Sequence, residues 1–133
     1  MHITDPIADM ITRLRNANIA GLKYTTIPAS ILKFEITKIL EARGMILGFR
    51  LIKDESGQGK IKIALKYTPS GSSVIKGLVR ISKSSCRVYK SYSKLSPIRG
   101  GLGFSILSTS KGVMTCSTAK KEKVGGEVMV HVW

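Results

Sequence analysis

The feature of this sequence that most constrains its fold is a break in pattern at residues 68–73, Thr-Pro-Ser-Gly-Ser-Ser. Clusters of Pro, Gly and Ser between patterned segments mark turns or linkers. Before the break, apolar residues recur mainly at helical spacing, and after it they form short runs typical of strands. A chain of 133 residues can form one compact domain or two small ones in contact. We therefore predict an α+β protein of two small domains, residues 1–68 and 69–133.

Two helices are predicted in the first domain. Asp5 is a suitable N-cap and Pro6 a suitable first residue for a helix that ends at Gly21. Ser30 is a second N-cap, for a helix that ends near Gly44. The first helix has Ile7, Met10, Ile11 and Leu14 at helical spacing and a favourable pair, Asp9 with Arg13. In the second helix the expected buried stripe is Leu32, Ile36, Ile39 and Leu40, with Lys33, Thr37 and Glu41 on the opposite side.

A short strand and a hairpin complete the first domain. Residues 24–27 form an extended segment between the two helices. After the second helix, Leu47, Phe49 and Leu51 alternate in one strand, and Ile61, Ile63, Leu65 and Tyr67 alternate with lysines in the next. Residues 54–59 between them have turn composition. The expected order is helix, strand, helix, hairpin.

The second domain is predicted to be mostly β. Short strands are expected at residues 74–81, 87–90, 104–107 and 128–132, and one or two helical turns near residues 116–123. Glycines at 100, 101 and 103 and at 125 and 126 separate these segments. The first of these glycine groups does not match a nucleotide-binding loop, because it is neither a GxGxxG between strand and helix nor a Walker A sequence.

The charge of the chain indicates a polyanionic partner. Lys and Arg number 22 against 8 Asp and Glu, which gives a net charge of +14 and a pI of about 10.1. Residues 1–68 hold 11 basic and 6 acidic side chains, whereas residues 69–133 hold 11 basic and only 2 acidic ones. Nucleic acid is the commonest partner of such a domain. A membrane surface is disfavoured as the partner because no helix joins a strongly basic face to a Trp/Phe/Leu-rich one. A third possibility, that the charge serves only to keep the protein soluble, stays open.

Several other classes of protein are not indicated. No apolar run approaches the ~18–20 residues that span a bilayer, and the start of the chain lacks the pattern of a signal peptide. We therefore expect a soluble protein whose Cys86 and Cys116 are reduced. His2 and His131 have no neighbours at metal-ligand spacing, so no metal or other cofactor is assigned. No nucleophile has an adjacent base and orienting acid, and no catalytic residue is assigned.

Two segments of the basic second half suit RNA. Ser108, Thr109, Ser110, Lys111 and Gly112 offer hydroxyls, a cation and a flexible backbone between two apolar runs. Arg87, Tyr89 and Lys90 alternate cationic and aromatic side chains along a predicted strand. The alternatives are an ordinary polar hairpin turn for the first segment and a solvated strand face for the second.

Glu127 is unusual as one of two acids in the second half. A carboxylate there either accepts hydrogen bonds from RNA or clamps a neighbouring Arg or Lys. The sequence alone favours the clamp.

Several separated motifs resemble the family of the eighth protein of the bacterial-type small ribosomal subunit. The resemblance rests on Ile106-Leu107-Ser108-Thr109-Ser110-Lys111-Gly112-Val113-Met114-Thr115, on Asp5-Pro6-Ile7-Ala8-Asp9-Met10 with Thr12-Arg13 and Arg15-Asn16-Ala17, on Arg80-Ile81-Ser82-Lys83 leading to Arg87-Val88-Tyr89, and on Gly125-Gly126-Glu127 near Trp133. These motifs occur in the family's order and cover essentially the whole chain.

The resemblance implies a two-domain protein that binds the central domain of small-subunit ribosomal RNA directly and helps to organise the platform. It assigns the main RNA contact to Ser108, Thr109, Ser110, Lys111 and Gly112, with Tyr89 and Glu127 placed by match. It assigns a second RNA surface to Asp5, Pro6, Arg13, Arg15 and Asn16. The implied partners include neighbouring small-subunit proteins and, for some members, their own messenger RNA. The implied location is the ribosome of the cytoplasm, with an organellar ribosome left open.

The chain departs from the family pattern at two places. Cys116-Ser117-Thr118-Ala119-Lys120 stands where the family usually has an Asp-Arg pair followed by Ala-Arg, so Lys120 keeps a positive charge without the bidentate fork of Arg. Ser84-Ser85-Cys86 stands where a Pro-Gly turn is usual. Two other functions are alternatives, a generic single-strand nucleic-acid module and a nucleic-acid-processing enzyme. The missing His and carboxylate clusters disfavour the enzyme.

Overall fold

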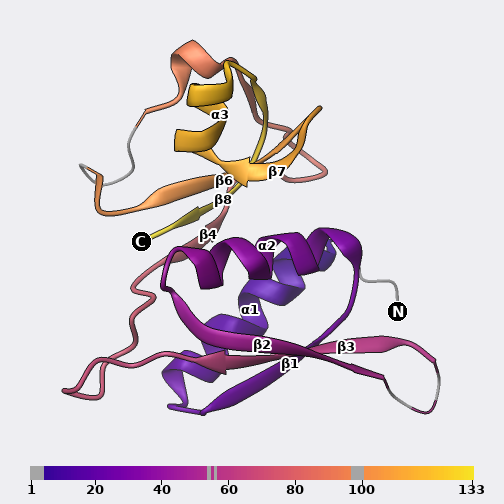
Figure 1. Ribbon diagram of the computed structural model, residues 1–133, viewed down its shortest axis with the longest axis vertical. Helices are drawn as coiled ribbons and strands as arrows, with labels where there is room; N and C mark the ends of the chain where they lie inside the picture. The colour runs from indigo at the N-terminus through magenta and orange to yellow at the C-terminus, as the bar shows by residue number, and fades with distance from the viewer. Residues whose placement is uncertain (1–4, 54, 56, 97–100) are drawn as a thin grey trace. The chain divides into compact units, whose positions relative to one another are not determined.

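The structure is a computed structural model that describes residues 5–53, 55, 57–96 and 101–133 (Figure 1). The chain forms two compact units, Met1–Ile75 and Lys76–Trp133. The first has the order helix, strand, helix, hairpin, and the second is mostly β, which confirms the predicted α+β class. That residues 1–68 and 69–133 are separate domains stays a prediction.

The first unit is a three-stranded antiparallel sheet with two helices. Its elements are α1 (Pro6–Ile19), β1 (Tyr24–Pro28), α2 (Ile31–Ala42), β2 (Ile46–Lys53) and β3 (Gly59–Leu65). The strands lie in the order β1-β3-β2. Ile27, Ile61 and Ile63 are fully buried on the face that the helices cover (Figure 1). The alternate residues of β1 and β3 face away from the helices.

Both helices start as their caps predict. The Ala8 N–H donates to Asp5 Oδ1 (3.1 Å), and Pro6 is the first residue of α1. The Lys33 N–H donates to the Ser30 hydroxyl (3.2 Å) at the start of α2. Gly21 and Gly44 follow the helix ends with φ of 70° and 72°, the left-handed region that favours glycine. Cap residues act on their own first turn, and local sequence therefore identified both starts.

The predicted buried stripe of α2 was wrong in two of its members. Lys33 and Thr37, expected on the outer side, are buried, whereas Leu32 and Ile39 are only half-buried. Both polar side chains have hydrogen-bond partners. Lys33 Nζ donates to the Pro28 carbonyl (3.2 Å), and the Thr37 hydroxyl donates to the Lys33 carbonyl (2.7 Å). Because burying a polar group costs little once it is hydrogen-bonded, the helix packs along residues 33, 36, 37 and 40.

The hairpin of β2 and β3 and the apolar alternation of β3 were predicted correctly, but the alternation predicted for β2 was wrong. Leu47 is 67% exposed and Leu51 is 57% exposed. A bulge between Ile46 and Gly48 shifts the register of β2 on β3, so Ile46 is the buried residue at this end. Of the predicted turn 54–59, Asp54 and Ser56 lie outside the described residues.

The second unit contains a five-stranded sheet. Its elements are β4 (Leu78–Arg80), β5 (Tyr89–Lys90), the 3₁₀ helix η1 (Tyr92–Lys94), β6 (Phe104–Thr109), β7 (Gly112–Thr115), α3 (Cys116–Glu122) and β8 (Gly126–Val132). The order is β4-β8-β6-β7, and β5 also pairs with β8. Each predicted strand is present, although the first is shortened to β4 and the second to β5, and β7 was not predicted. The segment at 116–123 is α3, capped by the Thr115 hydroxyl, which accepts from the Thr118 N–H.

A small core lies between the sheet and α3. It consists of Leu95, Leu107, Ala119 and Val128, with Ile81, Val88, Met114, Cys116 and Val124 packed against it. Gly126 allows β8 to approach β6 closely, because a Cβ there would meet the Ser108 carbonyl oxygen. This pairing places the start of β8 next to the end of β6, where the β6–β7 turn begins.

In the part of the chain that the structure describes, no helix is both long and apolar enough to cross a membrane. Cys86 is exposed, Cys116 is half-buried, and both are free thiols.

Candidate nucleic-acid interface

The segment Ser108–Gly112 forms a tight hairpin turn, not an extended loop. Thr109 in β6 pairs with Gly112 in β7, so only Ser110 and Lys111 connect the two strands. The Thr109 hydroxyl donates to the Gly112 carbonyl (2.8 Å) and accepts from the Lys111 N–H (3.1 Å). Gly112 has a φ of 113°, a conformation that side chains rarely adopt. Thr109 is therefore occupied in closing the turn.

Ser108, Ser110 and Lys111 are presented differently. Ser110 and Lys111 are exposed and Ser108 is half-buried. Lys111 Nζ lies 3.8 Å from the carboxylate of Glu122, and both side chains are at least half exposed. Such a pair is weak in water. The turn therefore offers two serine hydroxyls and a cation, Lys111, whose weak pair with Glu122 a ligand can replace with little loss of free energy.

Strand register brings three of the predicted segments together. Ser108 of β6 is opposite Glu127 of β8, and Glu127 is opposite Tyr89 of β5. In the next row, Thr109 is opposite Gly126, and Gly126 is opposite Lys90. Residues directly opposite in antiparallel strands point to the same face of a sheet. We call the residues Ser108, Glu127, Tyr89, Ser110 and Lys111 the serine row. Its members come from segments widely separated in the sequence.

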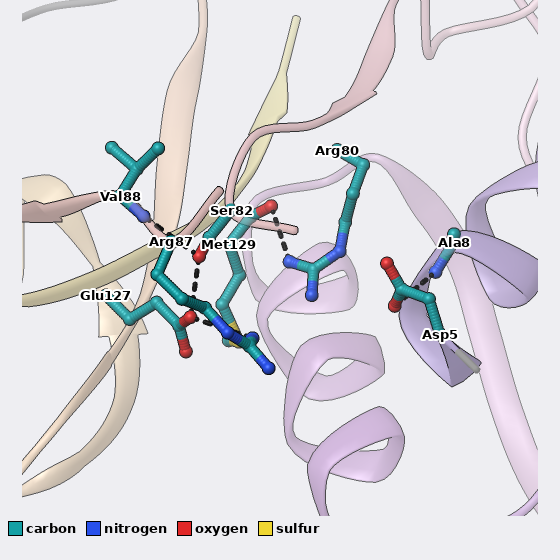
Figure 2. A network of polar contacts seen from close by, with 8 residues as sticks. All are labelled: Asp5, Ala8, Arg80, Ser82, Arg87, Val88, Glu127 and Met129. Carbon is teal, nitrogen blue, oxygen red and sulfur yellow. Dashed lines mark hydrogen bonds and ion pairs between the residues drawn. The ribbon is translucent and has the colours of Figure 1, made fainter. Parts of the chain in front are cut away.

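Glu127 is held by a network that Figure 2 shows. Its Oε2 accepts from the Ser82 hydroxyl (2.6 Å) and from Arg87 Nη1 (3.0 Å). The Ser82 hydroxyl in turn accepts from the Val88 N–H (3.1 Å). The interpretation of Glu127 as a clamp for a neighbouring cation therefore agrees with this geometry. Its second carboxylate oxygen has no hydrogen bond among those drawn in Figure 2.

The same network keeps Glu127 ionised. The Ser82 hydrogen bond is the largest of the effects that lower the pKa of this carboxyl below its usual value. Burial opposes the shift, and the hydrogen bond and charge of Arg87, with the charge of Arg80, add to it. The serine row therefore carries a fixed negative charge in a basic unit, and Arg87 is partly neutralised.

Sequence reasoning gave no role to Ser82, which turns out to be fully buried beneath Glu127. Its hydroxyl connects the carboxylate to the backbone that leads into β5. These residues are 45 positions apart, and an isolated serine after an apolar strand carries no signal of such a contact. Only the paired strands could have revealed it.

Tyr89 and Lys90 are the exposed residues of β5. Tyr89 is 69% exposed, which leaves its ring open to solvent beside Glu127. An exposed ring in a basic unit suits stacking on a base or sugar.

The second predicted surface, on α1, is only partly assembled. Asp5 serves as the helix cap and Pro6 as the first helical residue. Arg13 donates to Asp9 Oδ2 (3.0 Å), as predicted, while Arg15 and Asn16 are exposed. At about 100° per residue, Arg13 and Asn16 lie on one side of the exposed face and Arg15 on the other. The helix thus does not bring its two arginines together.

Within the described ranges, no group of three or more His, Cys, Asp and Glu residues could hold a metal ion. His131 is partly buried in β8, and burial followed by the charge of Lys90 lowers its pKa. The fold and the serine row define the class of the protein: a small, strongly basic α+β protein with polar side chains aligned across neighbouring strands of one sheet.

The family follows from comparison of the whole chain. The family model described as Ribosomal protein S8 matches residues 5–133. The chain therefore belongs to the Ribosomal protein S8 family, as its motifs predicted. Members of this family are structural, non-enzymatic components of the ribosome, so the prediction that the chain is not an enzyme is confirmed.

Relatives in several bacteria resemble the chain over its full length. A protein of Shouchella clausii (strain KSM-K16) is 50% identical over all of both chains. One of Clostridioides difficile (strain 630) is 48% identical over all of both chains. One of Azobacteroides pseudotrichonymphae genomovar. CFP2 is 54% identical over 98% of this chain and 100% of its own. Each is named small ribosomal subunit protein uS8.

Proposed function

We propose that this chain is a structural constituent of the small ribosomal subunit that binds the central domain of its RNA directly and aids assembly of the platform. The observation that carries the proposal is the serine row. The half-buried Ser108 shares a sheet face with Glu127 and the open Tyr89 ring, and the exposed Ser110 follows in the turn, all in the half of the chain with the larger cationic excess. Hydroxyls donate to phosphates and exchange hydrogen bonds with the 2′-OH of RNA.

Each member of the interface has a distinct role in the proposal. Ser108 and Ser110 bind the RNA backbone and Lys111 supplies charge at the turn. Lys90 pairs with Gly126, which places it on the other face of the sheet, and it adds only to the general positive charge of the unit. Tyr89 stacks, and Glu127 holds Arg87 while its second oxygen accepts from an RNA hydroxyl or amine. Thr109 and Gly112 shape the turn. A structured RNA helix fits this arrangement better than a loose strand, because the row is rigidly paired on both sides of β8.

A second contact is proposed for the exposed side chains of α1. Arg15 and Asn16 are proposed to reach RNA because both side chains are exposed on this helix. Other proteins of the small subunit, and the messenger RNA of the chain's own operon, are further proposed partners. The ribosome of the bacterial cytoplasm is the proposed location.

The serine row is tested by replacing Ser108 and Ser110 together with alanine. Thr109 is left in place because its hydroxyl closes the turn. Loss of two hydrogen bonds should weaken binding to protein-free small-subunit RNA by about 2 kcal/mol, roughly 30-fold. Filter binding at fixed salt measures this. The matched control is Ser84→Ala with Ser85→Ala, two exposed serines of the same unit, whose removal should leave affinity unchanged. Equal affinity of the row variant and the wild type would remove the turn from the interface.

Competition separates this function from generic single-strand binding. Unpaired homopolymer should not displace a structured small-subunit RNA helix from the serine row. Displacement at comparable concentrations would favour the generic module.

A further inference from the structure

The outer face of the first unit's sheet is strongly cationic. Register places three cations, Lys60, Lys62 and Arg50, on the face that the helices leave open, opposite the buried Ile61 and Ile63. Tyr24, Thr26 and Ile52 share that face through their pairing with β3. The strand residues that register assigns to it include no carboxylate.

A hollow of about 300 Å³ opens on this face. It is lined by Tyr24, Leu47, Gly48, Phe49, Arg50, Lys62 and Ala64. Gly48 and Ala64 are register partners with little or no side chain, which leaves room beside the Tyr24 ring. Leu47, displaced by the bulge of β2, adds an exposed apolar side chain. Ligand sites begin at about this volume.

The electrostatics of the hollow favour an anion that also has a flat ring. Lys62 Nζ lies 4.4 Å from the centre of the Tyr24 ring, and Tyr24 is 52% exposed. A cation over a ring at an exposed site contributes little, about 0.5–1 kcal/mol, so a base can replace it. Glu41 Oε2 lies 3.4 Å from where a Cβ on Gly48 would stand, so one carboxylate of α2 reaches the edge of the hollow and is outnumbered there by Arg50 and Lys62.

We propose that this hollow binds one unpaired nucleotide of an RNA strand. The base stacks on Tyr24 against Leu47, and the flanking phosphates pair with Lys62, Arg50 and Lys60. Base-on-aromatic stacking beside cations is the arrangement that binds single strands with little sequence preference. The contact involves residues other than the serine row and does not depend on it. An acidic peptide would use the cations but would gain nothing from the ring.

The test measures binding of fluorescent oligouridine of about eight nucleotides to the full chain. Tyr24→Ala should weaken it about tenfold, whereas Tyr24→Phe, which keeps the ring, should bind as the wild type does. Arg50→Gln with Lys62→Gln should lower the salt slope of binding by about 1.4, since each single-strand phosphate contributes about 0.7. Thermal unfolding of every variant checks that it is folded. If Tyr24→Ala is unstable, the binding of Tyr24→Phe and of the Arg50→Gln with Lys62→Gln variant tests the proposal.

Three results would overturn the proposal. One is absence of oligouridine binding by a folded wild type, and another is equal binding by Tyr24→Ala and Tyr24→Phe. The third is displacement of oligouridine by oligoglutamate of equal charge at the same concentration as by unlabelled RNA, because this would show that charge alone is recognised. The two proposals are tested by different variants and different RNAs, so one can fail while the other stands. The Ser108 and Ser110 variant should bind oligouridine normally, and Tyr24→Ala should bind structured small-subunit RNA normally.

Discussion

Glu127 shows how one acidic residue is accommodated in a basic sheet. Its carboxylate accepts two hydrogen bonds through one oxygen, from a buried serine and from an arginine. Charge-assisted hydrogen bonds of this kind are about twice as strong as neutral ones. The residue therefore stabilises the junction of β5 and β8 and also determines the charge of the serine row.

Glu127→Gln should change how stability depends on pH. The folded-state pKa of Glu127 is lowered, so its stabilising contribution is full above the unfolded pKa of about 4.3 and is lost as pH falls through the folded pKa. At neutral pH the Gln variant should be less stable by about 1–2 kcal/mol. This difference should shrink as the pH is lowered to about 3. Urea unfolding at several pH values measures it.

The matched control is Glu122→Gln, which removes the other acid of the second unit. Glu122 forms only a half-exposed pair with Lys111, 3.8 Å apart, so stability should be nearly unchanged. A constant difference between wild type and Glu127→Gln from neutral to acid pH would contradict the assigned ionisation.

At the scale of elements, the close approach of β8 to β6 is what aligns the serine row. Gly126 faces the Ser108 carbonyl and the Thr109 side chain, and Gly125 would place a Cβ 2.6 Å from the Lys90 carbonyl oxygen. Two successive glycines therefore let a strand pass closely between two neighbours. The requirement is for space, since neither glycine has a positive φ.

Gly126→Ala should separate these strands. The added Cβ meets backbone, which cannot rotate away, so the free energy of unfolding should fall by about 1–3 kcal/mol. Affinity for structured RNA should fall as well, because Ser108 moves relative to Glu127. Gly59→Ala is the control, since its Cβ would make an ordinary 3.4 Å contact with Ala29. A stable Gly126→Ala variant with unchanged RNA affinity would show that close strand approach is not needed.

At the scale of the whole molecule, the net charge of +14 predicts binding that weakens steeply with salt. Each phosphate that the chain neutralises adds about −0.7 to −0.9 to the slope of log affinity against log salt. Lys111→Gln should therefore reduce the slope for small-subunit RNA by about 0.7–0.9. Titrations between about 50 and 200 mM salt measure it.

Lys38→Gln provides the comparison for that slope. Lys38 is on α2, 3.7 Å from Glu35 and 5.5 Å from the centre of the Phe34 ring. Its removal lowers the net charge without touching the proposed interface, so the slope should stay as in the wild type. An equal reduction by Lys111→Gln and Lys38→Gln would mean that overall charge, not the serine row, directs binding.

The features that the sequence determined by itself are local or additive. Both helix starts were predicted because Asp5 and Ser30 satisfy N–H groups within their own first turn. The strand around Ile61 and Ile63 was predicted because burial of one face imposes a period of two. Net charge is a sum over residues. The motifs that indicated the family occur in order along the chain and need no folding to be recognised.

Only the tertiary structure decided which of these residues meet. Burial of Lys33 and Thr37 depends on carbonyls that α2 and the neighbouring chain present to them. Exposure of Leu47 depends on a bulge in its pairing with β3. The contact of Ser82 with Glu127, and the alignment of Ser108, Glu127 and Tyr89, require strands that are distant in sequence to pair in one register. Periodicity indicates that a face is buried, but strand pairing and packing determine what lies against it.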